Sequence, residues 1–295
     1  MKNRYQSTYR ASVIGMIGNI LLLFGKGMVG LLTNSQAMIA DAMNSFGDVF
    51  SSLLSFIGNK ISSKEADEDH NLGHGKAEYI FSFVISIIMC YTAIIIVKSA
   101  IQTYIDHKTI IFSYLLVMTS VVTIIVKFGL YLYTNKIYQK HHNILMKATS
   151  KDHRNDCLIT TLTLSSAIMG ILGFRIFDMI IAIIIAIWIM ITSIKIMKES
   201  YDVLMDKCMD EDTKDKVIEM IKNHEEIIKM NHFNSTPVGY RYQISFTIFV
   251  DGNLSTFESH DIANKLEREI EANIPEVYLT VIHVNPMKVK NSETE

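Results

Sequence analysis

The sequence predicts a membrane protein in which a six-helix transmembrane bundle is followed by a small α+β domain. Three observations lead to this fold class. Hydrophobic residues make up 49% of the 295 residues, long apolar segments recur up to about residue 205, and after Asp206 the pattern changes to short charged and alternating segments. Apolar segments of membrane length indicate spanning helices, whereas short amphipathic segments are typical of a water-exposed domain.

Six segments are long enough to cross a bilayer, which takes about 20 largely apolar residues in a helix. They are Ala11–Thr33, Met38–Ile61, Ala77–Tyr104, Ile110–Tyr133, Ile144–Leu172 and Ile176–Met197. The first of them is too long for the apolar region of a signal peptide, so we expect no cleavable signal.

The distribution of Lys and Arg predicts the orientation, because basic loops stay on the cytoplasmic side of a membrane. Basic residues precede the first segment and lie between the second and third and between the fourth and fifth. They are Lys2, Arg4, Arg10, Lys64, Lys76, Lys136 and Lys140, against Lys108 and Arg175 in the opposite loops. We therefore expect a multi-pass protein of the cell membrane with both termini in the cytoplasm.

The C-terminal residues predict five elements in the order αββαβ. The stretch "MDEDTKDKVIEMIKNHEE" has the pattern of a charged amphipathic helix, "HFNSTPVGY" that of a short strand and its turn, and "YRYQISFTIFVDG" that of an alternating strand. A second helix, "STFESHDIANKLEREIEANI", and a closing strand, "VYLTVIHV", follow. The predicted domains are therefore a membrane domain, residues 1–205, and a cytoplasmic domain, residues 206–295.

Charge and cysteine content exclude several classes of protein. The formal net charge of −2 gives no reason to expect a nucleic-acid partner. The three cysteines, Cys90, Cys157 and Cys208, form no Cys-x-x-Cys pair, so neither a disulfide framework nor a thiolate zinc site is indicated.

Polar residues inside two predicted membrane helices indicate a cation site. Asn44 and Asp48 in "IADAMNSFGDVFSS" are four residues apart, as are Asp152 and Asp156 in "ATSKDHRNDCLITT", so each pair lies on one face of its helix. A carboxylate at the centre of a membrane helix costs about 2.5–3.5 kcal/mol and usually marks an ion path. Hydrogen bonds that only hold helices together are the alternative, but carboxylates crowded without a cation would repel one another.

Other polar residues of the same segments have weaker signals. Asp41 shares the face of Asn44 and is either an outer ligand or gate, or a cap at the helix start. His153 lies about 100° around the helix from Asp152, so we expect it to meet water or a neighbouring helix rather than an ion. Lys26 and Lys127 are predicted to reach the interface or to pair across helices, and we assign them no ligand role.

These two polar pairs, together with "ADEDHNLGHGKAEYI" after the second segment, resemble the cation diffusion facilitator family. The resemblance covers nearly the whole chain and implies a homodimer that exports divalent transition metals in exchange for protons by alternating access. It also implies that Asn44, Asp48, Asp152 and Asp156 form the transport site and that the cytoplasmic domain is metallochaperone-like. On this reading the protein is a transporter, not an enzyme, and carries no catalytic cofactor.

The ligand types bear on the identity of the metal. Zinc-transporting members of this family typically have His at the position of Asp152, and His or Asp at that of Asn44, whereas here both positions offer oxygen. Hard oxygen ligands suit Mn(II) better than Zn(II), which favours imidazole and thiolate. The sequence is thus similar to the manganese branch of the family, with a zinc, iron or broad-range exporter as the alternative.

Two further features lie in the loop after the second segment. Asp67, His70 and His74 supply one carboxylate and two imidazoles, which suffice for a metal site, and the family has a secondary site at these positions. A solvated loop is the alternative. Lys76 and Asp206 match a family salt bridge at the junction of the membrane and cytoplasmic domains.

In the cytoplasmic domain, His232, His260 and His283 fall where relatives bind regulatory metal. Thr247 and Asn285 stand where the family has two more ligands. This departure predicts at most a weaker site, in a domain that mainly dimerises.

Two other classes compete with a transporter. An intramembrane aspartyl protease would carry a Gly-x-Gly-Asp signature, which the sequence lacks. A membrane-anchored metal sensor would bind metal without moving it, so metal flux in vesicles separates it from a transporter.

Overall fold

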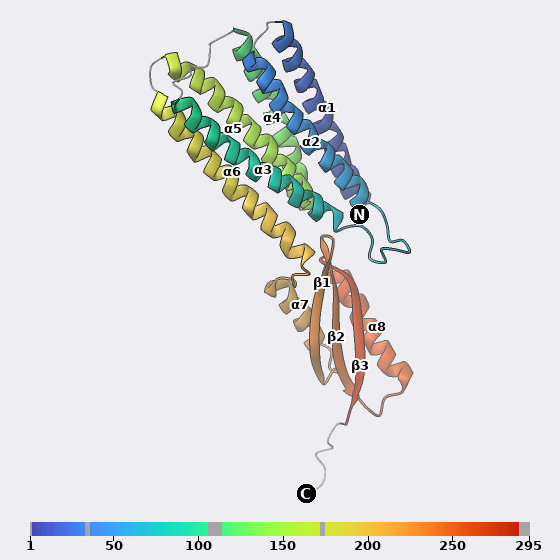
Figure 1. The fold of residues 1–295 in the computed structure, drawn as a ribbon. Coiled ribbons are helices and arrows are strands. Elements are labelled where there is room, and N and C mark those ends of the chain that lie inside the picture. Colours follow the sequence, from blue (N-terminus) through green and yellow to red (C-terminus); the bar gives the residue numbers. More distant parts are fainter. Residues whose placement is uncertain (1, 33–35, 106–113, 172–174, 289–295) are drawn as a thin grey trace. The chain divides into compact units, whose positions relative to one another are not determined.

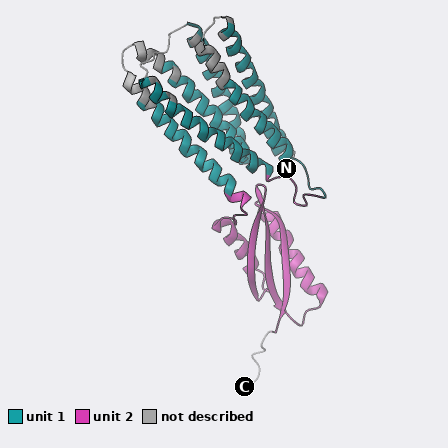
Figure 2. Cartoon of the chain, viewed as in Figure 1, with its two compact units in different colours: residues 1–68, 77–201 teal, residues 69–76, 202–295 magenta. Residues whose placement is uncertain are grey.

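The computed structural model describes residues 2–32, 36–105, 114–171 and 175–288. Contacts within the chain divide it into two compact units (Figure 2). The first lies within residues 1–68 and 77–201, and the second within residues 69–76 and 202–295. The segment 69–76 thus groups with the C-terminal unit.

The first unit contains six long helices that lie side by side (Figure 1). They are α1 (Lys2–Leu32), α2 (Gln36–Ser62), α3 (Ala77–Ile105), α4 (Tyr114–His141), α5 (Ile144–Ile171) and α6 (Arg175–Leu204), of which α6 runs into the second unit. The described part of each predicted apolar segment falls in one of them, whereas Thr33, residues 110–113 and Leu172 lie outside the described residues. Several helices extend beyond the apolar segment, as α1 does before Ala11, because backbone hydrogen bonding does not stop where hydropathy falls.

Length and hydropathy alone qualify three helices of the described part as membrane spans. They are Arg4–Val29 of α1, Ala77–Gln102 of α3 and Val117–His141 of α4. Helices α2 and α5 carry the polar pairs identified above, which lower their hydropathy. Polar residues of this kind are tolerated in a membrane when they face the interior of the bundle.

Small and polar side chains pack the bundle where helices approach. Gly58 of α2 lies so close to α3 and α5 that an added Cβ would be 2.8 Å from Phe81 Cβ and 2.9 Å from Leu145 Cδ2. Ser55 Oγ, also on α2, lies 3.1 Å from Ser12 Oγ of α1 and accepts a hydrogen bond from Thr149 Oγ1 of α5 at 3.0 Å. Buried interhelical hydrogen bonds of this type stabilise membrane bundles, where burial of apolar surface cannot drive helix association.

The elements of the second unit follow the order αββαβ, which confirms the prediction from the sequence. Its elements are α7 (Glu211–Lys222), β1 (Lys229–Val238), β2 (Arg241–Asp251), α8 (Thr256–Asn273) and β3 (Val277–Met287). The sheet order is β1-β2-β3, with β1 antiparallel and β3 parallel to the central strand β2. The β2–α8–β3 connection is therefore a crossover, which a parallel pair of strands requires.

Alternation along β2 places one face of the sheet in the core. Ile244, Phe246 and Ile248 are buried and share a hydrophobic cluster with Leu266 and Ile270 of α8. The helices begin at capping residues. Asp210 accepts a hydrogen bond from the backbone amide of Thr213, the third residue of α7. Ser255, the residue before α8, forms a capping box with Glu258.

The segment 69–76 joins this unit through a close backbone approach. Gly75 faces Gly239 in the β1–β2 turn, and a Cβ added to Gly75 would lie 3.0 Å from Gly239 Cα. Gly239 also has φ of +64°, a conformation that L side chains rarely adopt. Two glycines therefore allow the loop before α3 to pack on the hairpin.

Candidate metal centre

Three of the four residues predicted to form the membrane site line one small cavity in the bundle. Asp48 of α2 and Asp152 and Asp156 of α5 surround a cavity of about 60 Å³ together with Ser51 and Asn155. Apolar residues of α3 and α6, among them Ile88, Met89 and Ile189, complete its wall. Asn44 belongs to α2, but its side chain lies outside the described residues, as does that of Asp41.

A lysine from a third helix holds two of these carboxylates. Lys127 Nζ of α4 donates to Asp48 Oδ2 at 2.8 Å and to Asp156 Oδ2 at 2.5 Å, and its side chain is only 1% exposed. Of the two roles expected for Lys127, the structure shows pairing across helices. Its place at the candidate site was not predicted from the sequence, where a charge within the apolar run "TIIVKFGL" is the available signal.

The three aspartates do not form a tight cage by themselves. Among the described residues, one group of three or more His, Cys, Asp or Glu side chains has all its ligand atoms within 4.8 Å of one another. That group lies in the loop before α3 and does not include the three aspartates. In the bundle, the ammonium of Lys127 bridges Asp48 and Asp156.

Neighbouring polar groups fix the helices around the cavity. Asn19 of α1 donates to the backbone carbonyl of Asp48 at 3.2 Å and to Ser52 Oγ at 2.6 Å, which ties α1 to α2 at the level of the carboxylate. His153 is buried against α1, where a Cβ on Gly15 would lie 3.4 Å from its Nε2. The position of His153 agrees with the expectation that it meets a neighbouring helix.

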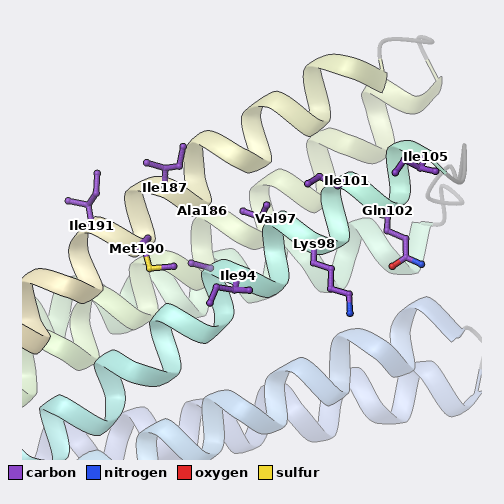
Figure 3. Close-up of a pocket in the computed structure, with 11 residues that line it drawn as sticks. Ile94, Val97, Lys98, Ile101, Gln102, Ile105, Ala186, Ile187, Met190 and Ile191 are labelled. Atoms are coloured by element: carbon purple, nitrogen blue, oxygen red, sulfur yellow. The ribbon is translucent and has the colours of Figure 1, made fainter.

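Another groove of the bundle differs in character from this cavity. It has a volume of about 770 Å³, lies between α3 and α6, and is lined mainly by aliphatic side chains such as Ile94, Val97 and Ile187 (Figure 3). Its charged lining residue is Lys98, a cation. The residues that line it include no carboxylate, so it lacks the carboxylate oxygen donors of a metal site.

The loop between α2 and α3 brings together the three residues predicted there. The ligand atoms of Asp67, His70 and His74 lie within 4.8 Å of one another, and the two imidazole rings have centroids 4.4 Å apart. Asp67 and His70 are exposed and His74 is half-buried. One carboxylate and two imidazoles at this spacing are a donor set that zinc or another divalent transition metal accepts.

Lys76 and Asp206 are also in contact. Lys76 Nζ donates to Asp206 Oδ1 at 2.6 Å, and the side chains are 38% and 56% exposed. Both residues belong to the second compact unit. Asp206 follows the end of α6 with φ of +55°, so the chain turns sharply at the residue that makes the ion pair.

The structure does not gather the three histidines of the C-terminal unit into one cluster. His232, His260 and His283 are exposed and lie on β1, α8 and β3, and no described group of metal-ligating atoms includes them. His283 is paired with Thr247 of β2, one of the two positions that lack a family ligand. His232 lies at a register shift in β1 and has φ of +54°.

Two family models match the chain in succession. Residues 12–205 match the cation efflux transmembrane domain, and residues 209–287 match the cytoplasmic domain of cation efflux proteins. The chain belongs to the cation efflux family. It is thus a multi-pass membrane protein with a six-helix transmembrane bundle and a cytoplasmic α+β domain, and it is a transporter of cations rather than an enzyme.

The names of similar proteins point to several functions among the relatives of this cation efflux protein. It is 28% identical over 292 residues to manganese efflux system protein MneP of Bacillus subtilis, covering 96% of this chain and 97% of the relative. It is 28% identical to magnetosome protein MamM of Magnetospirillum gryphiswaldense, covering 87% and 81% of the two chains. Cation-efflux pump FieF of Shewanella oneidensis is 25% identical, with coverage of 95% and 94%.

Proposed function

We propose that this cation efflux protein exports Mn(II) from the cytoplasm in exchange for protons, by alternating access to a site between α2 and α5. The observation that carries the proposal is the buried cavity lined by Asp48, Asp152 and Asp156. Carboxylates are rare inside membrane helices, and three around one cavity are suited to a divalent cation. In this proposal Asn44 supplies the fourth oxygen.

The preference for manganese rests on ligand chemistry. The proposed site offers only oxygen donors, which suit Mn(II), whereas Zn(II) favours nitrogen and sulfur. The similarity to a manganese efflux protein of Bacillus subtilis points the same way. A broad-range divalent cation exporter is the second candidate, because identity to a relative named only as a cation-efflux pump is nearly as high.

Exchange with protons follows from the same ligands. A carboxylate binds metal only when it is deprotonated, so metal binding and proton binding compete at each aspartate. When the site faces a more acidic exterior, protonation releases the metal. When it faces the cytoplasm, loss of the protons restores the ligands.

We further propose the arrangement of the rest of the molecule. The transport domain is residues 1–205, in the cell membrane with both termini in the cytoplasm, and residues 206–295 hold two copies together as a homodimer. The ion pair of Lys76 and Asp206 then stabilises the junction. The cluster of Asp67, His70 and His74 is proposed as a secondary metal site in the loop.

Flux measurements test the proposal. Wild-type protein in proteoliposomes with an imposed pH gradient is expected to move Mn(II) in preference to Zn(II), Fe(II) and Cd(II). The variants D48A and D156A are expected to lose the flux, whereas S165A, a substitution on α5 outside the residues that line the cavity, should keep it. Normal transport by D48A or D156A would remove this cavity from the mechanism.

A change of ligand type tests the preference for manganese. The double variant N44H/D152H supplies two imidazoles with two carboxylates, a set that suits four-coordinate Zn(II) at about 2.0–2.2 Å. We expect it to lose the preference for Mn(II), measured by calorimetry and flux in a background in which the loop residues Asp67, His70 and His74 are replaced. A wild type that prefers zinc would show that the ligand argument is wrong.

A further inference from the structure

Lys127 occupies the position between two of the proposed metal ligands. Its Nζ lies 2.8 Å from Asp48 Oδ2 and 2.5 Å from Asp156 Oδ2, and its side chain is 1% exposed. It comes from α4, whereas the carboxylates come from α2 and α5. Three helices thus meet at this one ammonium.

The ammonium and a metal compete for the same carboxylate oxygens, because both are cations that bind close to them. A divalent metal binds carboxylate oxygen at about 2.0–2.6 Å, and Nζ is already at hydrogen-bond distance from both oxygens. Charge-assisted hydrogen bonds of this length are among the stronger ones in proteins. An ion that binds Asp48 and Asp156 through these Oδ2 atoms therefore competes with Nζ for them.

The charges around the cavity indicate which ions succeed. Lys26 of α1 is also buried and exerts a weaker positive field on Asp156. Of the groups that line the cavity or touch its carboxylates, Asp48, Asp152 and Asp156 contribute three negative charges in their ionised forms and Lys127 one positive charge, which leaves −2 for these four groups. A single divalent cation neutralises that charge. A monovalent cation would leave a net charge of −1. In the place of the ammonium it would only exchange one positive charge for another, while losing its hydration.

We propose that Lys127 is a tethered counter-cation that makes the site selective for divalent over monovalent cations. The inference rests on the proposed function, since it takes the cavity of Asp48, Asp152 and Asp156 as the metal site. Lys127 binds no metal itself. It is a specificity-determining residue that acts by competing for the carboxylates and by setting the charge that an ion must neutralise.

Mn(II) titration in two salts tests the proposal. Full-length wild type, K127M and K127R are titrated calorimetrically with Mn(II) at about pH 8, where alkaline conditions favour ionised carboxylates, in sodium chloride and in choline chloride of equal ionic strength. The loop residues Asp67, His70 and His74 are replaced in every protein. Choline is too large to enter a cavity of about 60 Å³. The choline salt therefore provides the same ionic strength as the sodium salt without a cation that can occupy the site.

Wild type and K127R should have the same Kd in both salts. In K127M the cavity keeps three negative charges without the ammonium, so sodium should enter and raise the Kd for Mn(II) by about tenfold relative to choline, a ratio that calorimetry measures directly. The variant D48N/K127M, which removes one charge of each sign, should bind Mn(II) more weakly but again without dependence on sodium. If K127M does not fold, D48N/K127M can still be measured, because it leaves two unpaired carboxylates in the cavity rather than three.

The outcomes separate this inference from the proposed function. If wild type binds no Mn(II), or if D48N alone leaves binding unchanged, the proposed metal site fails. If D48N abolishes binding in wild-type background but K127M shows equal Kd in both salts, the site stands and the role of Lys127 is overturned. Sodium dependence in D48N/K127M, or in wild type, would contradict the charge argument as well.

Discussion

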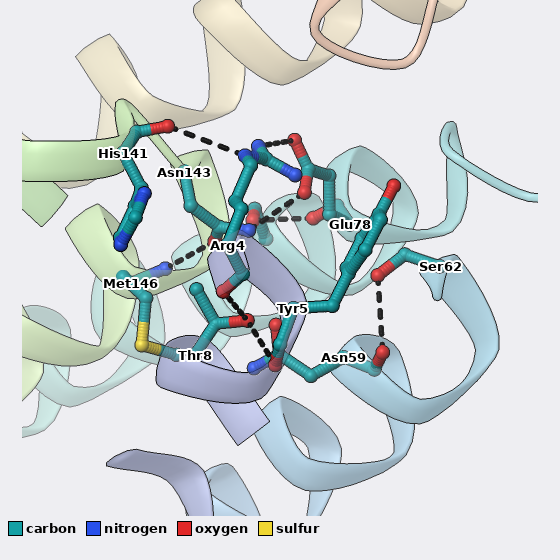
Figure 4. A network of polar contacts seen from close by, with 10 residues as sticks. Arg4, Tyr5, Thr8, Asn59, Ser62, Glu78, His141, Asn143 and Met146 are labelled. Atoms are coloured by element: carbon teal, nitrogen blue, oxygen red, sulfur yellow. Dashed lines mark hydrogen bonds and ion pairs between the residues drawn. The ribbon is translucent and has the colours of Figure 1, made fainter. Parts of the chain in front are cut away.

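Replacement of Glu78 by Gln should destabilise the helical bundle more than any exposed charge change. Glu78, in the first turn of α3, accepts from Arg4 Nη2 at 2.8 Å and from Asn143 Nδ2 at 2.7 Å (Figure 4). Asn143 in turn caps α5, because its Oδ1 accepts from Met146 N at 2.9 Å, and Arg4 also donates to the carbonyl of His141. One carboxylate thus connects α1, α3 and the turn between α4 and α5.

The size of the effect follows from burial. The side chains of Arg4 and Glu78 are 6% and 1% exposed. Two unit charges about 4 Å apart interact by ~4 kcal/mol at an effective dielectric constant of about 20. E78Q keeps the shape but leaves a buried guanidinium without its counter-charge, and it turns an amide donor toward another donor. Loss of one partner of a buried pair costs about 3–5 kcal/mol.

Unfolding of the full-length protein in mixed micelles, followed by far-ultraviolet circular dichroism, measures the change. E199Q is the matched control, because Glu199 pairs with Lys147 in the same bundle but is 46% exposed, and such pairs contribute about 0–1 kcal/mol. The double variant R4M/E78Q removes both charges and should recover part of the loss. If E78Q costs no more than E199Q, or if R4M/E78Q is worse than the sum of the single variants, the buried pair does not stabilise the bundle as argued.

Three further predictions concern other parts of the chain. Charge reversal by K76E should weaken the dimer or transport and K76E/D206K should restore part of it, although an exposed pair is worth only about 0–1 kcal/mol; zero coupling in the double-mutant cycle would show that the pair is no energetic unit. G58A should lower the unfolding midpoint, because its methyl group would meet side-chain atoms at 2.8 and 2.9 Å, at a cost of about 1–3 kcal/mol. G25A is the control: an added Cβ at Gly25 has no atom within 4 Å, so this variant should be neutral or stabilising. Equal unfolding midpoints for G58A and G25A would contradict the packing argument. At the start of α7, the hydrogen bond from a backbone amide lowers the pKa of Asp210. Its stabilising effect is therefore present above the ordinary pKa of about 4 and is lost as the pH falls through the lowered value. D210A should weaken α7 by about 1 kcal/mol at neutral pH and have less effect in acid, which hydrogen exchange of the α7 amides measures.

The sequence alone predicted the fold class because hydrophobic pattern and length are local properties. Segments of about 20 apolar residues indicate spanning helices wherever they occur, and alternation along "YRYQISFTIFVDG" predicts a strand without knowledge of its partners. Spacing by four residues likewise placed Asp152 and Asp156 on one face of α5. The candidate ligands followed from these local patterns and from the resemblance to a family.

Tertiary structure decided which distant residues meet. Spacing along the chain does not link Lys127 with Asp48 or Asp156, because the three residues lie on three different helices, α4, α2 and α5. Only the packing of these helices brings the ammonium to the two carboxylates. The same holds for Gly75 and Gly239, whose close approach places the segment 69–76 in the second unit. A local pattern determines the helix or strand and the face on which a residue lies, whereas the partner across that face depends on how all the elements pack together.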